Sequence, residues 1–468
     1  MPNLFADIAL FIWVPAALVF YRLFRPVTAA TVTILGAMVL LPANFSVDPP
    51  GLPPIDRHVV GGMGAIIGYL FVVPRRARHK MTARWPIVLV GALVLCAFVT
   101  VSTNTDALRY GDRSLPALSD YDAVGLVFNR LLTIGIPFLL GAKLVRTFDD
   151  VLSVLRVVVT FGLIYVPLVL WEARMSPQLH TTLYGYFPHD FYQHLRGGGY
   201  RPVVFTASGL ECGLFLATAT IAAIGLYQAK VRVLNMHPIV PAVALVVALA
   251  VSMSLAPLLY GLLVPALMLW TRPTTQARLA WFIAFVILSY PLLRSQDLFP
   301  TNLFVDAAES LSHDRAYSLE FRFRNEDALL QKARERFIFG WGSWGRNQIY
   351  DPTTGTDASV ADGYWIIEMG RFGLTGFLSF FGLLLLPLIL AARTLRSVPA
   401  GRARQVVVAL LLLVLVRAID LIPNGFLAPT TMFLAGALLQ VTTRARATPR
   451  ARAEPRAVPA RGPISAVR

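Results

Sequence analysis

Apolar stretches separated by short polar connections cover most of the chain. A helix that crosses the hydrocarbon core of a bilayer needs about 20 largely apolar residues, and about 17 at least. Thirteen stretches approach this length, at residues 4–21, 27–43, 58–74, 85–102, 123–142, 151–171, 202–227, 238–254, 256–270, 279–293, 364–391, 405–422 and 426–442. The two stretches around Pro257 are short. The pattern predicts an all-α, polytopic integral membrane protein with about 12–13 transmembrane helices.

Composition supports this prediction and excludes other classes of protein. Of the 468 residues, 56% are hydrophobic and only 15% are charged, whereas a soluble globular protein carries roughly 25% charged residues. This composition excludes a water-soluble multidomain enzyme and a disordered protein. The net charge of +16 lies mostly in the short connections, which is typical of membrane topology and not of a nucleic-acid-binding surface. We therefore expect the lipid bilayer as a partner, and no nucleic acid.

The distribution of Lys and Arg predicts which side each connection faces. After Thr443 the chain carries many arginines and one acid, Glu454, so we expect a disordered, basic, cytoplasmic tail. Other basic connections fall on the same side when the helices alternate, at residues 22–25, 75–84, 143–146, 230–232, 272–278 and 393–404. Thirteen helices place the N-terminus outside, and twelve place it in the cytoplasm.

Two of the outward connections are long, and long loops often carry function. We divide the chain into N-terminal helices (1–171), a first large outer loop (172–201), central helices (202–293), a second large outer loop (294–363), C-terminal helices (364–442) and the tail (443–468). The sequence contains no Gly-x-x-x-x-Gly-Lys-Ser/Thr phosphate loop, which argues against ATP-driven transport.

The second outer loop contains a predicted amphipathic helix. Apolar residues from Leu319 to Phe337 recur at helical spacing, and a charged face that includes Arg322, Arg324 and Glu326 lies opposite. This helix either lies on the membrane surface or uses one or two of its arginines to hold an anionic ligand. Both interpretations stay open on composition alone.

Aromatic residues occur in or beside both outer loops. Trp341 and Trp344 follow the predicted helix in a glycine-rich turn, Trp365 opens the next apolar stretch, and Tyr200 closes the first loop. Such residues commonly anchor a protein at the membrane interface. The apolar face of a pyranose also stacks well on an indole ring, so we expect either anchoring or sugar binding at these positions.

Charged residues inside apolar stretches are costly, and they indicate pairing or function. Glu211 and Arg130 both lie within such stretches, and Glu211 is one partner available to Arg130. Arg201 stands at the outer mouth of the stretch that contains Glu211, where it either anchors the helix end or binds an anion. Arg417 and Asp420, three residues apart, are expected to satisfy each other on one helix face.

Three blocks of these residues together resemble the O-antigen ligase/polymerase superfamily of bacterial envelope glycosyltransferases. In that family an arginine of the last large periplasmic loop precedes a helix and a glycine-containing turn, as Arg322 precedes Gly340-Trp341-Gly342 here. In the family, a polar pair, an aromatic residue and a Gly-x-x-Gly motif follow. This chain has a similar series in Asp362, Trp365, Gly373 and Gly376. An arginine ahead of a span, then Phe and small residues, is matched by Arg201, Phe205 and residues 209–213.

The resemblance implies a GT-C-like fold with two large periplasmic loops in the bacterial inner membrane. It implies a glycosyltransferase. Because the sequence shows no cluster of metal ligands, we expect a metal-independent reaction without a cofactor, and a single displacement by the acceptor would invert the anomeric carbon. Donor and acceptor would be oligosaccharides on undecaprenyl pyrophosphate, and a chain-length regulator is a further partner to expect. Arg322 and Arg201 would grip the leaving pyrophosphate, because guanidinium binds phosphate oxygens bidentately. Asp362 would orient and deprotonate the acceptor hydroxyl. Substrate contacts are expected from Arg324, Glu211, Trp341, Trp344, Trp365 and Tyr200.

One departure from the family pattern bears on the reaction. Ligases of this family carry His-Asn where this chain has Asp362-Gly363. The departure favours a polymerase of lipid-linked repeat units, for O-antigen, capsule or exopolysaccharide, over an O-antigen ligase. An O-antigen ligase or a protein O-oligosaccharyltransferase of the same superfamily stays an alternative. From another class, the alternative is a flippase or transporter of lipid-linked oligosaccharides.

Overall fold

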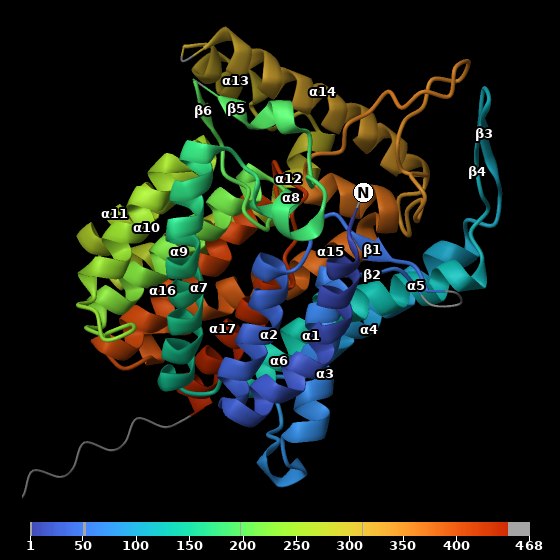
Figure 1. Ribbon diagram of the computed structural model, residues 1–468. Helices are drawn as coiled ribbons and strands as arrows, with labels where there is room; N and C mark the ends of the chain where they lie inside the picture. Colours follow the sequence, from blue (N-terminus) through green and yellow to red (C-terminus); the bar gives the residue numbers. More distant parts are fainter. Residues whose placement is uncertain (1, 50–52, 197, 311, 448–468) are drawn as a thin grey trace, which may run out of the picture.

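Helices dominate the computed structural model, which describes residues 2–49, 53–196, 198–310 and 312–447 (Figure 1). Each of the thirteen predicted stretches contains a helix. Seven helical runs are long and apolar enough to cross a membrane: α1 (Leu4–Leu23), α4 (Trp85–Ser102), α5–α6 (Asp120–Leu144), α7 (Phe148–Met175), α9 (Gly209–Gln228), α12 (Pro273–Ser295) and α15 with the turn after it (Tyr364–Ser397). The fold therefore agrees with a mostly helical, polytopic membrane protein.

The remaining helices of the bundle are shorter or carry more charge. Four are short apolar helices: α2 (Pro26–Leu40), α3 (Arg57–Val72), α10 (Ile239–Val251) and α11 (Leu255–Trp270). The last two are α16 (Arg402–Asp420) and α17 (Pro429–Ala447). Within the fifth predicted stretch, α5 (Asp120–Arg130) passes through a π-helical turn (Leu131–Gly135) into α6 (Ile136–Leu144).

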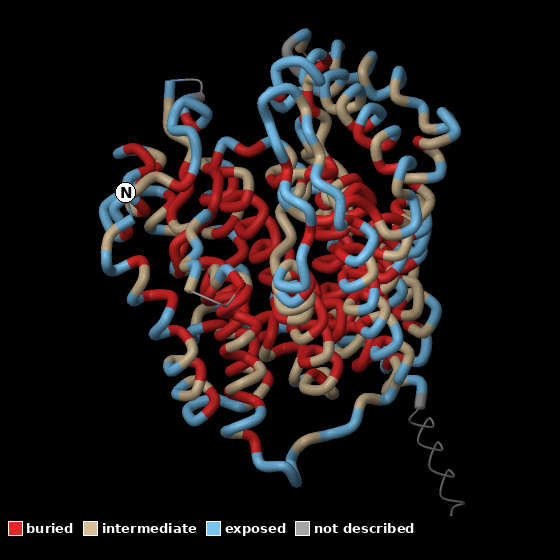
Figure 2. The backbone as a smooth tube through the Cα atoms, turned by 90° about the vertical axis from the view of Figure 1, so that its right-hand side faces the viewer, coloured by how far each residue is buried: buried red, intermediate tan, exposed pale blue. Residues whose placement is uncertain are grey.

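Large apolar side chains cover the outside of the bundle as well as its core. Val88, Trp270 and Phe282 have relative exposures of 70%, 84% and 57%. A soluble protein rarely exposes large contiguous apolar patches, whereas a bilayer covers them with hydrocarbon. Buried residues fill the centre of the bundle, and exposed ones gather on its periphery and at its ends (Figure 2). The exposed apolar residues thus support the membrane assignment independently of helix length.

Several predicted boundaries differ from the structure; α12 begins at Pro273 and α14 (His313–Glu335) at His313, each six residues before the predicted start, and two further differences concern α9 and the tail. The stretch predicted at 202–227 becomes helical only at Gly209, because the Ser208 hydroxyl caps α9 by accepting a hydrogen bond from the Glu211 N–H at 3.3 Å. The tail predicted from residue 443 begins later, since α17 continues to Ala447. The rest of the predicted disordered tail, 448–468, lies outside the described residues.

The two long loops both lie at one end of the bundle, which we name the outer end (Figure 1). The first loop forms α8 (Leu179–Tyr184), a short 3₁₀ turn and the hairpin β5–β6 (Leu195–Arg196 and Gly199–Tyr200). The second forms α13 (Thr301–Glu309) and α14 (His313–Glu335). Two further hairpins are β1–β2 (Ser46–Val47 and Ile55–Asp56) and β3–β4 (Leu108–Tyr110 and Arg113–Leu115). We name the opposite end, where α17 finishes, the tail end.

The predicted amphipathic helix exists as α14, but it is anchored to protein as well as exposed. Leu330 and Ala333 are buried as the apolar pattern predicts, whereas Phe337 lies beyond the helix and is 45% exposed. Glu326, which the pattern placed on the charged face, is buried. Its carboxylate accepts hydrogen bonds from Tyr290 of α12 and Trp365 of α15, at 3.0 and 3.1 Å. These bonds fix α14 above the bundle.

A break in α15 joins the second outer loop to the bundle. Gly373 has φ +63° inside the helix, a conformation that glycine adopts readily and other residues rarely. The N–H groups of Trp341 and Gly342 donate to the carbonyls of Gly370 and Arg371 before the break, both at 2.9 Å. After the break, the N–H of Leu374 donates to the Phe337 carbonyl at 2.8 Å. The glycine-rich turn therefore supplies the hydrogen-bond partners that the interrupted helix loses.

Candidate functional site

The second outer loop holds two of the predicted catalytic residues, Arg322 and Asp362. Their side chains lie together. Arg322 Nε is 3.3 Å from Asp362 Oδ2. Their side chains are 39% and 37% exposed, so both groups are accessible from the outer end. Arg322 comes from α14, which Glu326 anchors, and Asp362 immediately precedes α15, whose Tyr364 N–H donates to the Leu421 carbonyl at 2.9 Å. Two anchored elements thus hold this ion pair.

Buried charged groups continue from this ion pair into the bundle. The charge of Arg322 acts on Asp420, near the end of α16, and the charge of Arg417 acts on Asp420 and Glu211. Glu211 in turn pairs with Arg57 at 2.8 Å. These charged side chains are thus linked by two ion pairs and by electrostatic interactions between them. We name this set the charge row: Asp362, Arg322, Asp420, Arg417, Glu211 and Arg57.

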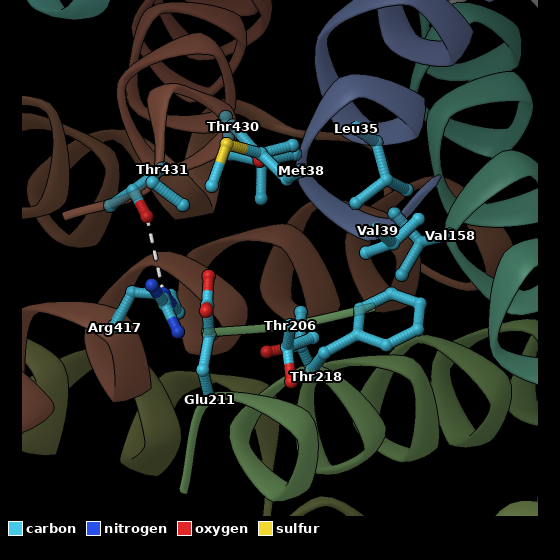
Figure 3. Close-up of a pocket in the computed structure, with 13 residues that line it drawn as sticks. Leu35, Met38, Val39, Val158, Thr206, Glu211, Thr218, Arg417, Thr430 and Thr431 are labelled. Atoms are coloured by element: carbon cyan, nitrogen blue, oxygen red, sulfur yellow. Dashed lines mark hydrogen bonds between the residues drawn. The ribbon is translucent and has the colours of Figure 1, made fainter. Parts of the chain in front are cut away.

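A small cavity of about 50 Å³ lies beside the inner part of the charge row. Figure 3 shows Glu211 and Arg417 at this cavity, with Thr430 and Thr431 nearby. Arg417 Nε donates to the Thr431 hydroxyl at 3.2 Å. The expected ion pair between Arg417 and Asp420 is wrong, since no contact within 4.0 Å joins their charged atoms among the described residues. Asp420 instead accepts from the Asn424 amide at 2.9 Å.

Glu211 is held by an arginine that the sequence analysis did not single out. Arg57 Nη2 donates to both carboxylate oxygens of Glu211, at 3.0 and 2.8 Å. Arg57 Nη1 donates to the Met38 and Phe205 carbonyls at 2.9 and 3.1 Å. Arg57 is the first residue of α3 and only 2% exposed. A basic residue at the start of an apolar stretch resembles an ordinary flanking charge, so its burial was not visible in the sequence.

Arg130 has a different partner from the one considered in the sequence analysis. It pairs with Glu368 of α15 at 2.5 Å, and both side chains are buried. Its guanidinium also lies over the Phe372 ring, 3.8 Å from the centroid. The pairing of Arg130 with Glu211 is therefore excluded, and α5 is tied instead to α15 one turn before the helix break.

Arg201 lies at the start of α9 and packs over its first residue. Its Nε donates to the Ser254 hydroxyl at 2.9 Å, and a side chain at Gly209 would collide with the Arg201 side chain. Its backbone N–H donates to the His194 carbonyl at 2.8 Å. Tyr200 precedes it on β6 and is half-buried. The structure thus fixes Arg201 between the first outer loop and the α10–α11 connection, on a different element from Arg322.

Arg324 and Trp365 differ sharply in exposure. The side chain of Arg324 is 61% exposed and lies 3.9 Å from Glu320 on the same helix, so it is open to a ligand. Trp365 is fully buried, with its N–H donated to Glu326. Its ring also contacts Tyr290, with ring centroids 5.1 Å apart. In this conformation the Trp365 indole faces protein groups and no solvent.

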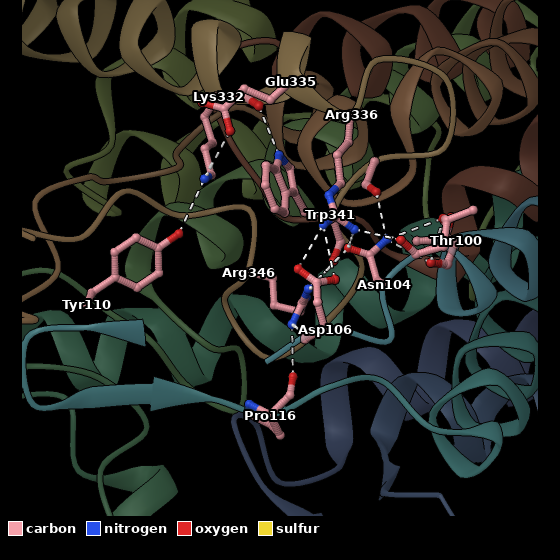
Figure 4. Close-up of polar contacts among 12 residues, drawn as sticks. Thr100, Asn104, Asp106, Tyr110, Pro116, Lys332, Glu335, Arg336, Trp341 and Arg346 are labelled. Atoms are coloured by element: carbon pink, nitrogen blue, oxygen red, sulfur yellow. Dashed lines mark hydrogen bonds and ion pairs between the residues drawn. The ribbon is translucent and has the colours of Figure 1, made fainter. Parts of the chain in front are cut away.

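Trp341 is enclosed by cationic side chains. Lys332 Nζ and the Arg336 guanidinium lie 3.9 and 4.3 Å from its ring centroid, and its indole N–H donates to the Lys332 carbonyl at 2.9 Å. Asp106 pairs with Arg336 and Arg346 at 3.0 and 3.1 Å. Figure 4 shows this cluster joining the loop after α4 to the glycine-rich turn. The cluster stabilises the outer end and leaves the Trp341 ring covered.

Trp344 remains open to a ligand. It is 60% exposed, and its indole N–H donates to Asp122 at 2.7 Å. It lines a cavity of about 550 Å³ together with Tyr121, Asn129 and Arg371. Proline residues of the β1–β2 connection form another wall of this cavity. The sequence analysis missed Arg371, because its place in the row Glu368-Met369-Gly370-Arg371 carries no signal that it would face a cavity.

Neither a known protein-family model nor a curated protein matches the sequence. Among the residues that the structure describes, no three His, Cys, Asp or Glu side chains are grouped closely enough to hold a metal ion. The candidate site is therefore described by its geometry alone. It consists of the exposed ion pair of Arg322 and Asp362 at the outer end, the charge row that continues from this pair, and the separate cavity beside Trp344.

Proposed function

We propose that this protein is a glycosyltransferase that polymerises lipid-linked oligosaccharide repeat units. The observation that carries the proposal is the contact between Arg322 and Asp362 at the outer end, 3.3 Å apart and partly exposed. The family resemblance independently implies that these two residues belong to one active site. A cationic group for the leaving pyrophosphate and a carboxylate for the acceptor hydroxyl are the two groups that such a transfer needs.

The proposed reaction is a single displacement at the anomeric carbon of the donor sugar. The acceptor hydroxyl oxygen forms the new bond to this carbon, and the bond from the carbon to the pyrophosphate oxygen breaks. The proton of the hydroxyl passes to the Asp362 carboxylate. The undecaprenyl pyrophosphate leaves as an anion, and Arg322 stabilises its charge with Arg201 as a further grip. Inversion at the anomeric carbon follows from a single displacement.

The sugars require contacts outside the ion pair. Trp344 is our candidate for stacking on a pyranose, since it is exposed and borders the cavity of about 550 Å³. Arg324 is exposed close to Arg322 on the same helix and suits an anionic part of the substrate. Glu211 acts indirectly, because it forms an ion pair with Arg57 and interacts electrostatically with Arg417 in the charge row.

The proposal includes a location. The outer end would face the periplasm and the tail end the cytoplasm of a bacterial cell, with the helices in the inner membrane. The basic connections that the sequence places at the tail end support this orientation. Donor and acceptor would then both be presented in the outer leaflet, where the first sugars of each lipid-linked chain reach the outer loops.

The test uses purified full-length protein in detergent with a lipid-pyrophosphate-linked repeat unit. The products are separated on a gel, with no ATP and in the presence of EDTA. A ladder of lengthening glycans is expected. Transfer of one unit to an added lipid A-core or protein acceptor, without a ladder, would identify a ligase or oligosaccharyltransferase and overturn the polymerase.

One observation favours a second candidate function. The inner part of the charge row lies inside the bundle beside a cavity, and α15 is broken at Gly373. Buried charges and interrupted helices are also features of transporters. A flippase for lipid-linked oligosaccharides would move a fluorescent lipid-linked glycan across liposomes without making any glycosidic bond, which the gel assay distinguishes.

A further inference from the structure

A third cavity, of about 320 Å³, lies at the tail end, opposite the loops that carry the candidate site. Four basic residues from three separate segments line it: Arg25, Lys143, Arg146 and Arg444. Arg25 precedes α2, Lys143 ends α6, Arg146 connects α6 to α7, and Arg444 lies in the last turns of α17. Residues far apart in the sequence thus bring four positive charges to one cavity.

The charges of Arg25, Lys143 and Arg146 are poorly balanced by carboxylates of the described residues. The acidic group in the lining is Asp150, and its Oδ2 already accepts from the backbone N–H groups of Arg146 and Thr147 at 2.9 and 2.8 Å. Among the described residues, no ion pair joins Arg25, Lys143 or Arg146 to an acidic side chain. Arg146 Nε is buried without a hydrogen-bond partner in that part of the chain. The cavity therefore holds donors that lack acceptors.

Arg146 and Arg444, which line the same cavity, interact electrostatically. Partial burial and the neighbouring charge of Arg444 lower the pKa of its guanidinium, and Asp150 only partly opposes them. Two guanidinium groups that line one cavity repel each other. An anion between them would remove this repulsion and satisfy the Arg146 donor.

The backbone adds to the positive potential. Helices α2 and α7 both begin at this cavity, with Pro26 and Thr147 in its lining. The N-terminus of a helix carries partial positive charge and unpaired N–H groups. The α7 N-terminus is capped by Thr147 and Asp150, whereas no side chain caps that of α2.

We propose that this cavity binds a phosphate group, taken either from an anionic phospholipid of the adjacent leaflet or from a soluble phosphate compound. Guanidinium and ammonium groups are the usual partners of phosphate oxygens. Basic pockets between transmembrane helices on the cytoplasmic side recognise phospholipid headgroups. Apolar residues at the rim, Val27, Val73 and Leu144, would contact the glycerol and the start of an acyl chain.

The experiment titrates full-length protein in detergent with three probes: phosphatidylglycerol, phosphatidylcholine and inorganic phosphate. Thermal unfolding and native mass spectrometry report binding. Phosphatidylglycerol is expected to raise the unfolding midpoint and to remain bound in the mass spectrum, whereas phosphatidylcholine is not. An equal effect of inorganic phosphate would identify a soluble phosphate compound as the ligand, and would still support the site.

The paired variant Lys143→Gln/Arg146→Gln tests the residues. We expect its affinity for phosphatidylglycerol to fall on the order of tenfold or more, while Lys143→Arg retains binding. Arg232→Gln, which removes an exposed cation from another connection at the tail end, is the matched control and is expected to bind like the unmodified protein. Equal affinities of the paired variant and the control would overturn the proposal.

Discussion

The Nε atom of Arg322 lies 3.3 Å from Oδ2 of Asp362, although one residue belongs to α14 and the other precedes α15. Both side chains are more than a third exposed, with values of 39% and 37%. An ion pair in such a position contributes little to stability, typically about 0–1 kcal/mol. Stability is therefore a weak reason for the pair, and a ligand-binding or catalytic role explains it better.

Replacing Arg322 is expected to abolish most transfer activity. Arg322→Ala removes the group that we propose to stabilise the leaving pyrophosphate, which should cost on the order of 10²–10³ in rate. Arg322→Lys keeps the positive charge but lacks the bidentate guanidinium, so its transfer rate should lie between the rates of the unmodified protein and of Arg322→Ala. The rate of ladder formation by purified protein measures this. Arg334→Ala, an exposed arginine of the same helix, serves as the control and should stay near the unmodified rate. Equal rates for Arg322→Ala and Arg334→Ala would refute the assignment.

Asp362 is expected to act on turnover more than on binding. Asp362→Asn keeps the shape of the side chain but cannot accept a proton, so kcat should fall by about 10²–10⁴. KM for the lipid-linked donor should change little, because Asn leaves Arg322 free to bind phosphate. Initial rates at varied donor concentration separate the two constants. A rise in KM with unchanged kcat would show that Asp362 only positions Arg322.

The sequence predicted the helices well because apolar periodicity and length determine them. All thirteen stretches contain a helix, and α14 forms where apolar residues from Leu319 onward recur at helical spacing. The boundaries at Gly209 and Ala447 were missed, since they depend on a cap at Ser208 and on packing that no local pattern encodes. The break at Gly373 was seen as a motif, but its hydrogen bonds to the glycine-rich turn require the tertiary structure.

The site was predicted in part. The sequence grouped Arg322 and Asp362 because they stand in one predicted outer loop and match a family pattern, and the structure brings the two side chains to 3.3 Å of each other. Arg57 and Glu368 were missed, because pairing across helices is a matter of three-dimensional packing. For the same reason, the sequence could not separate Trp344, which is 60% exposed, from Trp365, which is fully buried. Exposure depends on what covers a residue, and composition does not reveal that.

The buried pair between Arg57 and Glu211 is expected to matter for stability. Glu211→Gln leaves Arg57 buried beside a neutral amide, and breaking such a pair costs about 3–5 kcal/mol. Chemical unfolding of the protein in detergent measures this loss. Glu320→Gln, which removes an exposed acid 3.9 Å from Arg324, should change stability by about 0.5 kcal/mol at most. The double variant Arg57→Met/Glu211→Leu should recover part of the loss, because no charge is then left unpaired.

Gly373 is expected to tolerate no side chain. Gly373→Ala would force alanine into φ +63° and place its Cβ 2.5 Å from the Ile338 backbone. The positive φ alone costs of the order of 1–3 kcal/mol, and the collision adds to this cost. We expect a lower unfolding midpoint and weaker protection of residues 337–342 from hydrogen exchange. The control is Gly91→Ala in α4, where a Cβ meets nothing within 4 Å and where alanine favours the helix by roughly 0.5–1 kcal/mol. Similar stability of both variants would show that the break is not constrained as described.

His180 is expected to make the first outer loop sensitive to acid. Burial lowers its pKa to about 4, the charge of Arg57 acts in the same direction, and the Tyr186 carbonyl only partly opposes them. Its Nε2 accepts from the Ala43 N–H at 3.1 Å, while Nδ1 lies 2.9 Å from the Tyr186 carbonyl. These two contacts together require the neutral ring protonated at Nδ1, so a second proton would displace the Ala43 bond.

The sign of the pH effect follows from the lowered pKa of His180. In the unfolded chain His180 becomes protonated near pH 6.5, whereas in the folded loop it becomes protonated only near pH 4. The contribution of neutral His180 to the free energy of unfolding is therefore fully present above about pH 6.5. It is lost progressively as the pH falls to about 4, by up to about 3 kcal/mol. Hydrogen exchange of residues 179–186 at pH 7.5, 6 and 5 measures this loosening. His180→Gln, whose amide oxygen can accept the Ala43 N–H but does not titrate, should remove the dependence over this range. Loosening of the variant with the same midpoint would mean that another group is responsible.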